Sequence, residues 1–325
     1  MNRRILVVGG AGYIGSQTCK VLKQHGYEPF VFDNLGTGHR RFVRWGPLIE
    51  GDILDPDALR QALTATAPVA VIHFAAFAYV GESVENPGKY YRNNVVGSLN
   101  LLEAMRDTGV GQLVFSSTCA TYGVPERLPL TEDHPQNPIN PYGAGKQMVE
   151  RMMSDFAVAH GLKFVVFRYF NAAGADPEGE TGEIHHPETH LIPLVLDVAA
   201  GKRPHIKVFG TDYDTPDGTC IRDYIHTVDL AEAHVSALRY IEAGGEMTAF
   251  NLGNGSGFSV REVISTAEAV TGKPIPLILD ARRPGDPDRL VGDAAAARHF
   301  LNWVPRFSDL PTIIRHAWDF HRRLP

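Results

Sequence analysis

The sequence predicts an α/β protein with a doubly wound parallel sheet, followed by a second, smaller mixed α/β domain. The apolar run 5–8 begins almost at the N-terminus and leads directly into glycines, which is typical of a strand buried on both faces. Strand and helix patterns then alternate up to residue 171, which indicates right-handed crossovers between parallel strands. After residue 171 the pattern becomes irregular, with polar loops over 172–190 and 210–220.

The glycines after the first strand have the spacing of a phosphate-binding turn. Gly10, Gly12 and Gly15 fit G-x-G-x-x-G, and Gly9, Gly12 and Gly15 fit G-x-x-G-x-x-G. Glycine allows a tight turn, a close approach of the backbone to a pyrophosphate and close packing of the next helix. That helix would direct its N-terminal amides at the phosphates. A glycine-rich turn without a ligand is the alternative.

The second strand, at 30–32, ends at an acidic residue. Asp33 follows Gly15 by 18 residues, the position at which a carboxylate accepts hydrogen bonds from ribose hydroxyls. The same carboxylate would repel a 2′-phosphate. The sequence therefore favours NAD over NADP.

The remaining elements follow from periodicity and capping residues. Strands are expected at 48–51, 69–76, 113–115 and 164–170, and helices after Asp55, at 90–108 and at 142–160. The second half predicts helices near 191–200, 228–243 and 260–271 and from about 310, with strands at 206–209 and 250–252. We expect a cofactor-binding domain over 1–171 and a substrate domain over 172–325. The segment 228–252 either belongs to the second domain or folds back onto the first sheet.

Composition favours an enzyme of the cytoplasm that acts on small molecules. The net charge is −6, with 21% charged residues and no run of like charge, which argues against nucleic acid or an anionic membrane as partner. No apolar stretch approaches the roughly 20 residues of a membrane span. The three cysteines, Cys19, Cys119 and Cys220, are far apart and form no C-x-x-C, so neither a disulfide framework nor a structural zinc site is expected.

A tyrosine and a lysine lie one helical turn apart in the predicted helix 142–160. Tyr142 and Lys146 therefore share one face. A phenol is a poor base at neutral pH, and a nearby ammonium favours the phenolate, so Tyr142 is the candidate base. Ser116, Ser117 and Thr118 end the preceding strand and offer hydroxyls to substrate and phenol. Chance spacing and turn formation are the alternatives.

Longer motifs extend these features over most of the chain and resemble the UDP-glucose 4-epimerase family, a group of extended short-chain dehydrogenases/reductases. The similarity runs from Arg4 to Trp303. The runs at 222–226 and 282–286 resemble nucleotide-sugar members in particular, whereas the glycine and Tyr/Lys motifs belong to the whole superfamily. The motifs are Gly9-Gly10-Ala11-Gly12-Tyr13-Ile14-Gly15, Asp33-Asn34-Leu35, Gly51-Asp52-Ile53, His73-Phe74-Ala75-Ala76, Val80-Gly81-Glu82-Ser83, Tyr142-x-x-x-Lys146, Arg168-Tyr169-Phe170-Asn171, Arg222-Asp223-Tyr224-Ile225-His226, Asn251-Leu252-Gly253 and Arg282-Arg283-Pro284-Gly285-Asp286.

The resemblance implies an NAD-dependent epimerase of Rossmann fold that inverts C4 of a UDP-hexose through a transient 4-keto sugar. Tyr142 would take the proton of the 4-hydroxyl, Lys146 would hold the nicotinamide ribose and tune Tyr142, and Thr118 would relay the proton. A homodimer is implied as well, paired through the helices 90–108 and 142–160.

The implied ligand contacts form two sets. The cofactor-binding set is Gly9, Gly12, Tyr13, Ile14, Gly15, Asp33, Asn34, Asp52, Ile53, Phe74, Ala75, Ala76, Asn93, Ser116, Tyr142, Lys146 and Tyr169. The substrate-binding set is Thr118, Tyr142, Asn171, His190, Leu191, Val208, Phe209, Arg222, Tyr224, Arg283, Asp286 and Leu290.

Some positions depart from the family pattern or leave alternatives open. Ala78 stands where many members carry a lysine, and His190 replaces a frequent asparagine. Leu290, at the position that closes the sugar pocket, is intermediate between the tyrosine and the small residues of other members. UDP-N-acetyl sugars are therefore expected to be used poorly, and UDP-xylose/UDP-arabinose remains an alternative pair because a pentose omits only the C5 hydroxymethyl group. A dehydratase is disfavoured because Cys119-Ala120 follow Thr118 where an acid pair is needed, and a non-catalytic regulator is disfavoured because Tyr142 and Lys146 are present.

A run of histidines and glutamates raises the question of a metal. Its members lack the fixed helical spacing of H-E-x-x-H, so no metal is predicted, and a solvated or substrate-facing loop is expected. The residues concerned are Glu183, His185, His186, Glu188 and His190.

Overall fold

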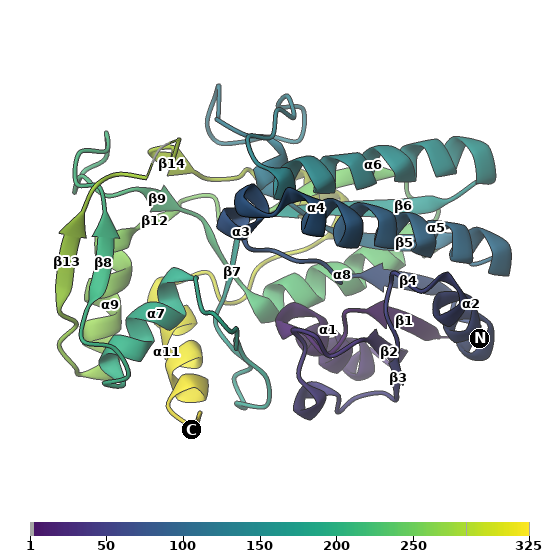
Figure 1. Ribbon diagram of the computed structural model, residues 1–325, viewed down its shortest axis with the longest axis horizontal. Helices are drawn as coiled ribbons and strands as arrows, with labels where there is room; N and C mark the ends of the chain where they lie inside the picture. The colour runs from purple at the N-terminus through teal and green to yellow at the C-terminus, as the bar shows by residue number, and fades with distance from the viewer. Residues whose placement is uncertain (1–2, 284, 325) are drawn as a thin grey trace.

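A computed structural model describes residues 3–283 and 285–324, so Pro284 of the predicted 282–286 motif lies outside the described residues. Its centre is a seven-stranded sheet of order β11-β6-β5-β4-β1-β2-β3 in which each neighbouring pair is parallel (Figure 1). The predicted doubly wound parallel sheet is confirmed. The strands are β1 (Arg4–Val8), β2 (Glu28–Asp33), β3 (Leu48–Glu50), β4 (Ala70–His73), β5 (Gln112–Thr118), β6 (Lys163–Tyr169) and β11 (Thr248–Leu252).

Helices cover both faces of this sheet. Side chains of β1 alternate between two apolar clusters, Ile5 and Val7 in one and Leu6 and Val8 in the other, because successive residues of a strand face opposite sides. This explains the unbroken apolar run. The first cluster includes α1 (Tyr13–Gln24), α8 (Thr227–Glu242) and α10 (Ala295–Leu301), and the second includes α2 (Pro56–Thr66), α5 (Gly97–Thr108) and α6 (Pro141–His160).

Two predicted elements differ from the structure. The strand expected at 69–76 ends at His73, because Phe74 and Ala75 both donate their amides to the carbonyl of Val8 and the chain leaves the sheet. The segment expected as a helix at 90–108 is helical throughout, but the helix begins earlier, at Pro87, and contains a π-helical stretch. Its region consists of α3 (Val80–Glu85), α4 (Pro87–Tyr90), a π-helical segment η2 (Tyr91–Val96) and then α5.

The segment after α8 returns to the large sheet. β11 pairs with β6 as an edge strand, and α8 packs on α1. Apolar residues of α10 join the same cluster. The chain therefore contributes to the large sheet from both halves, and the boundary at residue 171 stays a prediction.

The rest of the second half forms a smaller mixed group of elements beside the carboxyl edge of the sheet (Figure 1). Three helices with their own apolar cluster accompany short strands in sheets of order β10-β7, β12-β9-β14 and β13-β8. Strands of two or three residues show no alternation, which explains why the sequence did not predict most of them. These elements are α7 (Leu191–Ala199), α9 (Val260–Thr271), α11 (Leu310–His321), β7 (Asn171–Ala173), β8 (Ile206–Phe209), β9 (Ile221–Arg222), β10 (Tyr224–His226), β12 (Phe258–Ser259), β13 (Leu277–Asp280) and β14 (Arg289–Leu290).

None of the helices in the described part of the chain has the length and apolarity needed to cross a bilayer.

Candidate active site

One large cavity of about 1300 Å³ lies between the carboxyl ends of the central strands and the smaller group of elements. Ligand sites for a single small molecule are typically roughly 300–1,000 Å³, so this cavity has room for more than one. Every residue of the two predicted sets lines it except Asp52 and Val208.

The glycine turn of the cavity has no space for side chains. Gly9 has φ of +84°, and a Cβ there would lie 2.5 Å from the amide nitrogen of Ala75. A Cβ on Gly15 would lie 2.2 Å from the carbonyl oxygen of Gly9. Gly12 is the N-cap of α1, and no described side chain caps this helix end. The uncapped amides and the bare turn fit a pyrophosphate.

Asp33 lies at the end of β2 with both carboxylate oxygens fixed. Oδ2 accepts from the amide of Ala11 at 2.9 Å and Oδ1 from that of Leu35 at 2.8 Å. Burial raises the pKa of Asp33, and these two hydrogen bonds oppose the rise. Asp52 does not line the cavity, and its carboxylate accepts from Asn34 Nδ2 at 2.9 Å. The glycine turn and the buried carboxylate of Asp33 together form a site that fits NAD.

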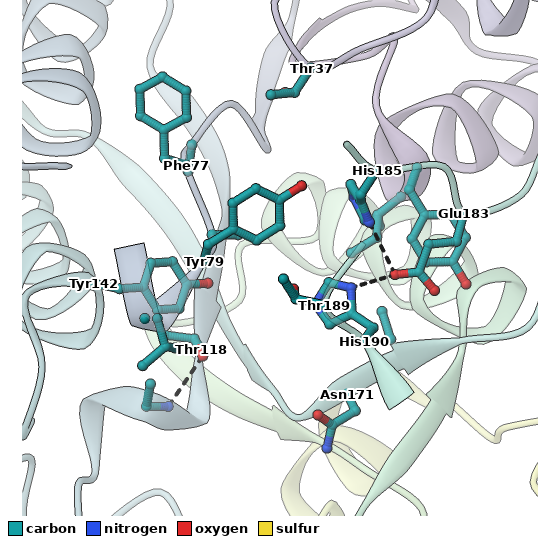
Figure 2. A pocket seen from close by; sticks show the side chains of 18 of the residues that line it. Thr37, Phe77, Tyr79, Thr118, Tyr142, Asn171, Glu183, His185, Thr189 and His190 are labelled. Atoms are coloured by element: carbon teal, nitrogen blue, oxygen red, sulfur yellow. Dashed lines mark hydrogen bonds and ion pairs between the residues drawn. The ribbon is translucent and has the colours of Figure 1, made fainter. Parts of the chain in front are cut away.

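Tyr142 lies in the first turn of α6. The side chain of Asn140 caps the helix by accepting from the amide of Gly143 at 2.8 Å. In Figure 2 the hydroxyl groups of Tyr142 and Thr118 lie close together. Burial raises the pKa of Tyr142, and a hydrogen bond with Thr118 opposes this. In the protein alone the phenol is therefore protonated, because burial outweighs the predicted influence of Lys146.

Lys146 is buried under Tyr142 on the same helix face. Its Nζ donates to the carbonyl oxygen of Ser116 at 2.7 Å and lies 4.7 Å from the Phe115 ring centroid. Burial lowers the pKa of Lys146 to about 7, and the charge of Glu150 partly offsets this. The Lys146 amino group thus exchanges a proton near neutral pH.

The three hydroxyls at the end of β5 do not all face the cavity. Ser116 and Thr118 line it, whereas Ser117 points to the opposite face of the strand and donates to Glu150. The idea that Ser117 serves the substrate is wrong, and the reason is strand alternation. Ser116 is instead hydrogen-bonded to the hydroxyl of Tyr169.

A buried ion pair behind the site was missed by sequence reasoning. Arg168 of β6 donates to both carboxylate oxygens of Glu150, with Nη2 at 2.6 Å from Oε2. Both side chains are only 9% exposed. The only signal in the sequence is that Glu150 follows Lys146 by one helical turn.

The far wall of the cavity carries cationic and polar groups. Arg222 of β9 forms an ion pair with Asp286, and the guanidinium of Arg283 lies 4.2 Å from the Phe209 ring centroid. Asn171 donates to the carbonyl of Asp223 at 2.9 Å. The side chain of Val208 does not reach the cavity, because β8 alternates and directs Val208 into the core, whereas Phe209 lines the cavity. Two guanidiniums in one wall suit a pyrophosphate.

The loop 183–190 forms part of the cavity and is not simply solvated. The Glu183 side chain is 8% exposed, and Glu183, His185, Glu188 and His190 all line the cavity (Figure 2). The carboxylates raise the pKa of His185 to about 9 and of His190 to about 10, against the effect of burial. Of the two predicted alternatives, the substrate-facing loop agrees with this position.

Further residues that sequence reasoning missed lie on the segment after β4. Asn94 in η2 fixes this segment, since its amide group accepts from the amide of Phe77 and donates to the carbonyl of Phe77, both at 2.9 Å. Tyr79 then extends into the cavity and its ring lies 6.0 Å from that of His185 (Figure 2).

The glycine turn, the acid that ends β2 and the Tyr142–Lys146 pair over a parallel sheet define an enzyme of the short-chain dehydrogenase/reductase type. The comparisons with known proteins agree. The chain belongs to the NAD dependent epimerase/dehydratase family, whose sequence profile matches residues 5–253.

Individual relatives are similar over almost the whole chain. The UDP-glucose 4-epimerase of Rhizobium leguminosarum bv. trifolii is 54% identical over 319 residues, which cover 98% of this chain and 97% of the relative. The crystal structure of UDP-glucose 4-epimerase from Brucella ovis in complex with NAD is 55% identical, with a TM-score of 0.96 and 98% of each chain covered. The structure of the Bifidobacterium longum enzyme in complex with NAD⁺ and UDP is 37% identical, with a TM-score of 0.92, covering 98% of this chain and 97% of the other.

Proposed function

We propose that the protein is an NAD-dependent epimerase that interconverts UDP-glucose and UDP-galactose by inverting C4 of the hexose. The observation that carries this proposal is that Tyr142, Lys146 and Thr118 lie in one cavity, between a cradle that fits NAD and a wall that fits a nucleoside diphosphate. The similarity to UDP-glucose 4-epimerases that are 54% and 55% identical to this chain supports the choice of substrate.

In this proposal Tyr142 exchanges a proton with the 4-hydroxyl group of the sugar. NAD, when bound, supplies the acceptor and donor of the C4 hydride. Thr118, whose hydroxyl lies beside the phenol, bridges phenol and sugar oxygen. Lys146 holds a positive charge near the phenol when protonated, which favours the phenolate. Since the hydride leaves and returns, the sugar must expose its opposite face between the two transfers.

The far wall would hold the UDP part and leave the sugar room to turn. Arg222 and Arg283 would bind the pyrophosphate, and Asn171 and Tyr224, which line the same cavity, would bind other parts of the nucleotide. Leu191 begins α7 at the same wall. Anchoring by the nucleotide fixes the substrate while the sugar itself keeps rotational freedom.

We also propose the organisation of the whole protein. Residues 1–171 with 228–252 would bind NAD, and the rest of 172–325 would bind the UDP-sugar.

The protein would be a homodimer, and exposed apolar side chains on η2 and α6 support this. It would act in the cytoplasm, which the free thiols of Cys19, Cys119 and Cys220 support.

The test is to incubate the purified protein with UDP-galactose, UDP-xylose and UDP-N-acetylglucosamine, without added NAD, and to identify the products. Formation of UDP-glucose from UDP-galactose is the expected main result. A 4-keto-6-deoxy product would instead identify a dehydratase. Conversion of UDP-xylose alone would identify the pentose epimerase.

A further inference from the structure

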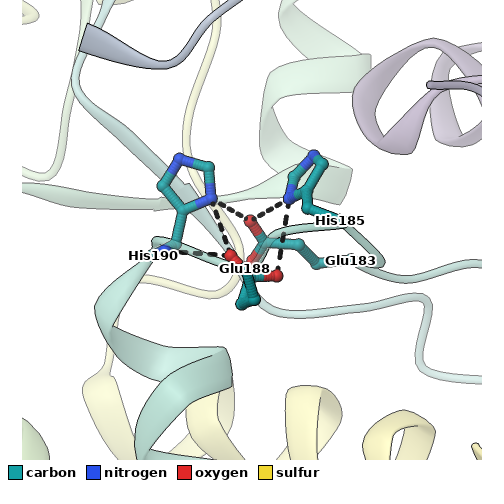
Figure 3. A group of neighbouring side chains, drawn as sticks. All are labelled: Glu183, His185, Glu188 and His190. Atoms are coloured by element: carbon teal, nitrogen blue, oxygen red, sulfur yellow. Dashed lines mark hydrogen bonds and ion pairs between the residues drawn. The ribbon is translucent and has the colours of Figure 1, made fainter. Parts of the chain in front are cut away.

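Four potential metal ligands converge in the loop 183–190. Figure 3 shows Glu183, His185, Glu188 and His190 with their polar atoms turned toward one centre. One ligand atom from each residue lies within 4.8 Å of all the others. Two imidazoles and two carboxylates are a donor set that suits zinc and similar divalent ions.

The distances between these atoms approach those of a tetrahedral metal site. A tetrahedron with metal–ligand bonds of roughly 2.0–2.1 Å has ligand–ligand edges of roughly 3.3 Å. His185 Nδ1 lies 3.3 Å from Glu183 Oε1 and 3.5 Å from Glu188 Oε2. His190 Nδ1 lies 3.4 Å from Glu188 Oε1 and 2.6 Å from Glu183 Oε1. Three of these four distances are close to such an edge. The distance from His190 Nδ1 to Glu183 Oε1 would have to widen, and one oxygen of Glu188 would have to serve both histidines.

The two histidine nitrogens are an independent observation. Nδ1 of His185 and Nδ1 of His190 are both buried, and neither has a hydrogen-bond partner of acceptable geometry within the described residues. Imidazolium rings held only by ion pairs would direct their N–H groups at the carboxylate oxygens. The two nitrogens face the carboxylates at ion-pair distances without such a hydrogen bond, and a divalent cation that displaced their protons would take them as ligands.

We propose that Glu183, His185, Glu188 and His190 form a structural site for a divalent transition metal, with zinc as the expected ion. With four protein ligands the site would be closed, so the metal would have no open position for chemistry. It would fix the loop between Tyr79 on one side and the start of α7 on the other. With Nδ1 on the metal, the neutral His190 ring must carry its hydrogen on Nε2, which makes His190 a hydrogen-bond donor in the cavity.

The test is metal binding by the full-length protein. After removal of metal with a chelator, the protein is titrated with Zn²⁺ and with Co²⁺, and bound metal is measured by mass spectrometry and by visible absorption. We expect one equivalent per chain and the intense absorption of tetrahedral cobalt. The cobalt titration of the unaltered protein needs no variant to fold.

Variants locate the bound ion. His185→Gln and Glu183→Gln should weaken binding by more than the roughly 10–100-fold that loss of a ligand's hydrogen-bond partner costs. His186→Gln is the matched control, because His186 lies in the same loop but is exposed and outside the cluster. It should bind like the unaltered protein. Circular dichroism and NAD binding confirm that each variant is folded.

Two results would overturn the proposal. One is the absence of stoichiometric metal binding, which would leave a network of ion pairs only. The other is equal binding by all variants, which would identify an adventitious ion elsewhere on the surface. Neither result depends on epimerase activity, so this inference and the proposed function can fail separately.

Discussion

The phenol of Tyr142 is a poor base in the protein alone, since burial raises its pKa. The neighbouring Lys146 has its pKa lowered to about 7 by the same burial. A bound cofactor cation would shift the pKa of the phenol downward. In the proposed mechanism Tyr142 would therefore act as a base only in the assembled site, which would limit proton transfer to the time when a hydride acceptor is present.

The first prediction concerns this residue. Tyr142→Phe should lower kcat by at least ~10²–10⁴-fold, the usual contribution of a general base, while fold and NAD binding stay intact. The measurement is turnover of UDP-galactose beside a fluorescence titration with NAD. Tyr79→Phe is the control, because Tyr79 places another phenol in the same cavity. Equal activity of the two variants would reject Tyr142 as the base.

The second prediction concerns sugar size. Leu290 lines the cavity and packs beside Phe170. Its branched side chain fills volume that serine would leave open, so Leu290→Ser should raise kcat/KM for UDP-N-acetylgalactosamine relative to UDP-galactose. Exchange of a small group in a pocket is typically worth ~1–3 kcal/mol, or roughly 10–200-fold. If the unaltered protein already uses both sugars equally, Leu290 does not limit sugar size.

At the scale of elements, the ion pair of Glu150 and Arg168 joins α6 to β6 under the catalytic face. Ser117 of β5 also donates to Glu150, so three neighbouring elements meet at one carboxylate. Since α6 also carries Tyr142 and Lys146, this junction ties the helix that bears both side chains to β5 and β6.

The third prediction tests this junction. Glu150→Gln leaves the Arg168 guanidinium buried without a counter-charge, which typically costs about 3–5 kcal/mol. The free energy of unfolding from urea denaturation should fall by that order. The double variant Glu150→Gln with Arg168→Met should lose less than the sum of the two single variants, because no unpaired charge remains. Strict additivity would show that the pair does not act as a unit.

The sequence predicted the features that local interactions form, and it missed the contacts between residues that are far apart in the chain. The glycine turn, Asp33 and the Tyr142–Lys146 pair could be placed in one site because strand ends and helical turns fix them locally. The partnership of Glu150 with Arg168 could not, because it depends on how α6 packs over the sheet. The loop 183–190 has no periodicity, so the convergence of its side chains could not be predicted either.

At the scale of the whole molecule, buried histidines make stability depend on pH. Burial lowers the pKa of His73 to about 3, of His226 to about 3 and of His234 to about 4. Below the ordinary value of 6.5 the unfolded chain binds protons that the folded protein does not. The part of the free energy of unfolding that depends on these three histidines staying neutral is therefore fully present above pH 6.5 and is lost as the pH falls toward 3.

The fourth prediction follows from His234. His234→Gln keeps a donor for the Leu230 carbonyl, which Nδ1 meets at 2.8 Å, but cannot titrate. Between pH 6.5 and 4 the variant should lose less stability than the unaltered protein, by roughly 3 kcal/mol over the whole interval. Urea denaturation at several pH values measures this.

The raised pKa values of Asp33, Asp223 and Asp229 act in the opposite direction, but they cancel in the difference between the variant and the unaltered protein. His299→Gln, at an exposed histidine, is the control.

The homodimer is the proposal that concerns the whole molecule. The structure shows which apolar residues of the two predicted dimer helices are exposed and could form its interface. Leu102, Met105 and Val149, three of the apolar residues of the two predicted dimer helices, are buried within one chain. Val96 of η2 and Met148 of α6 are each 46% exposed. They line a shallow apolar hollow together with Gly88, Tyr91, Arg92 and Val95.

The last prediction is that charges in this hollow separate the dimer. Val96→Asp with Met148→Asp should give a monomer by light scattering at micromolar concentration, because burying two carboxylates in an apolar interface without partners is costly. Both side chains are already half-exposed, so the monomer should keep its fold and its NAD binding. Val158→Asp is the control on α6, since Val158 is 92% exposed, and it should leave the mass of a dimer. A monomeric unaltered protein would refute the dimer itself, whereas a dimer that survives both charges would place its interface on another face.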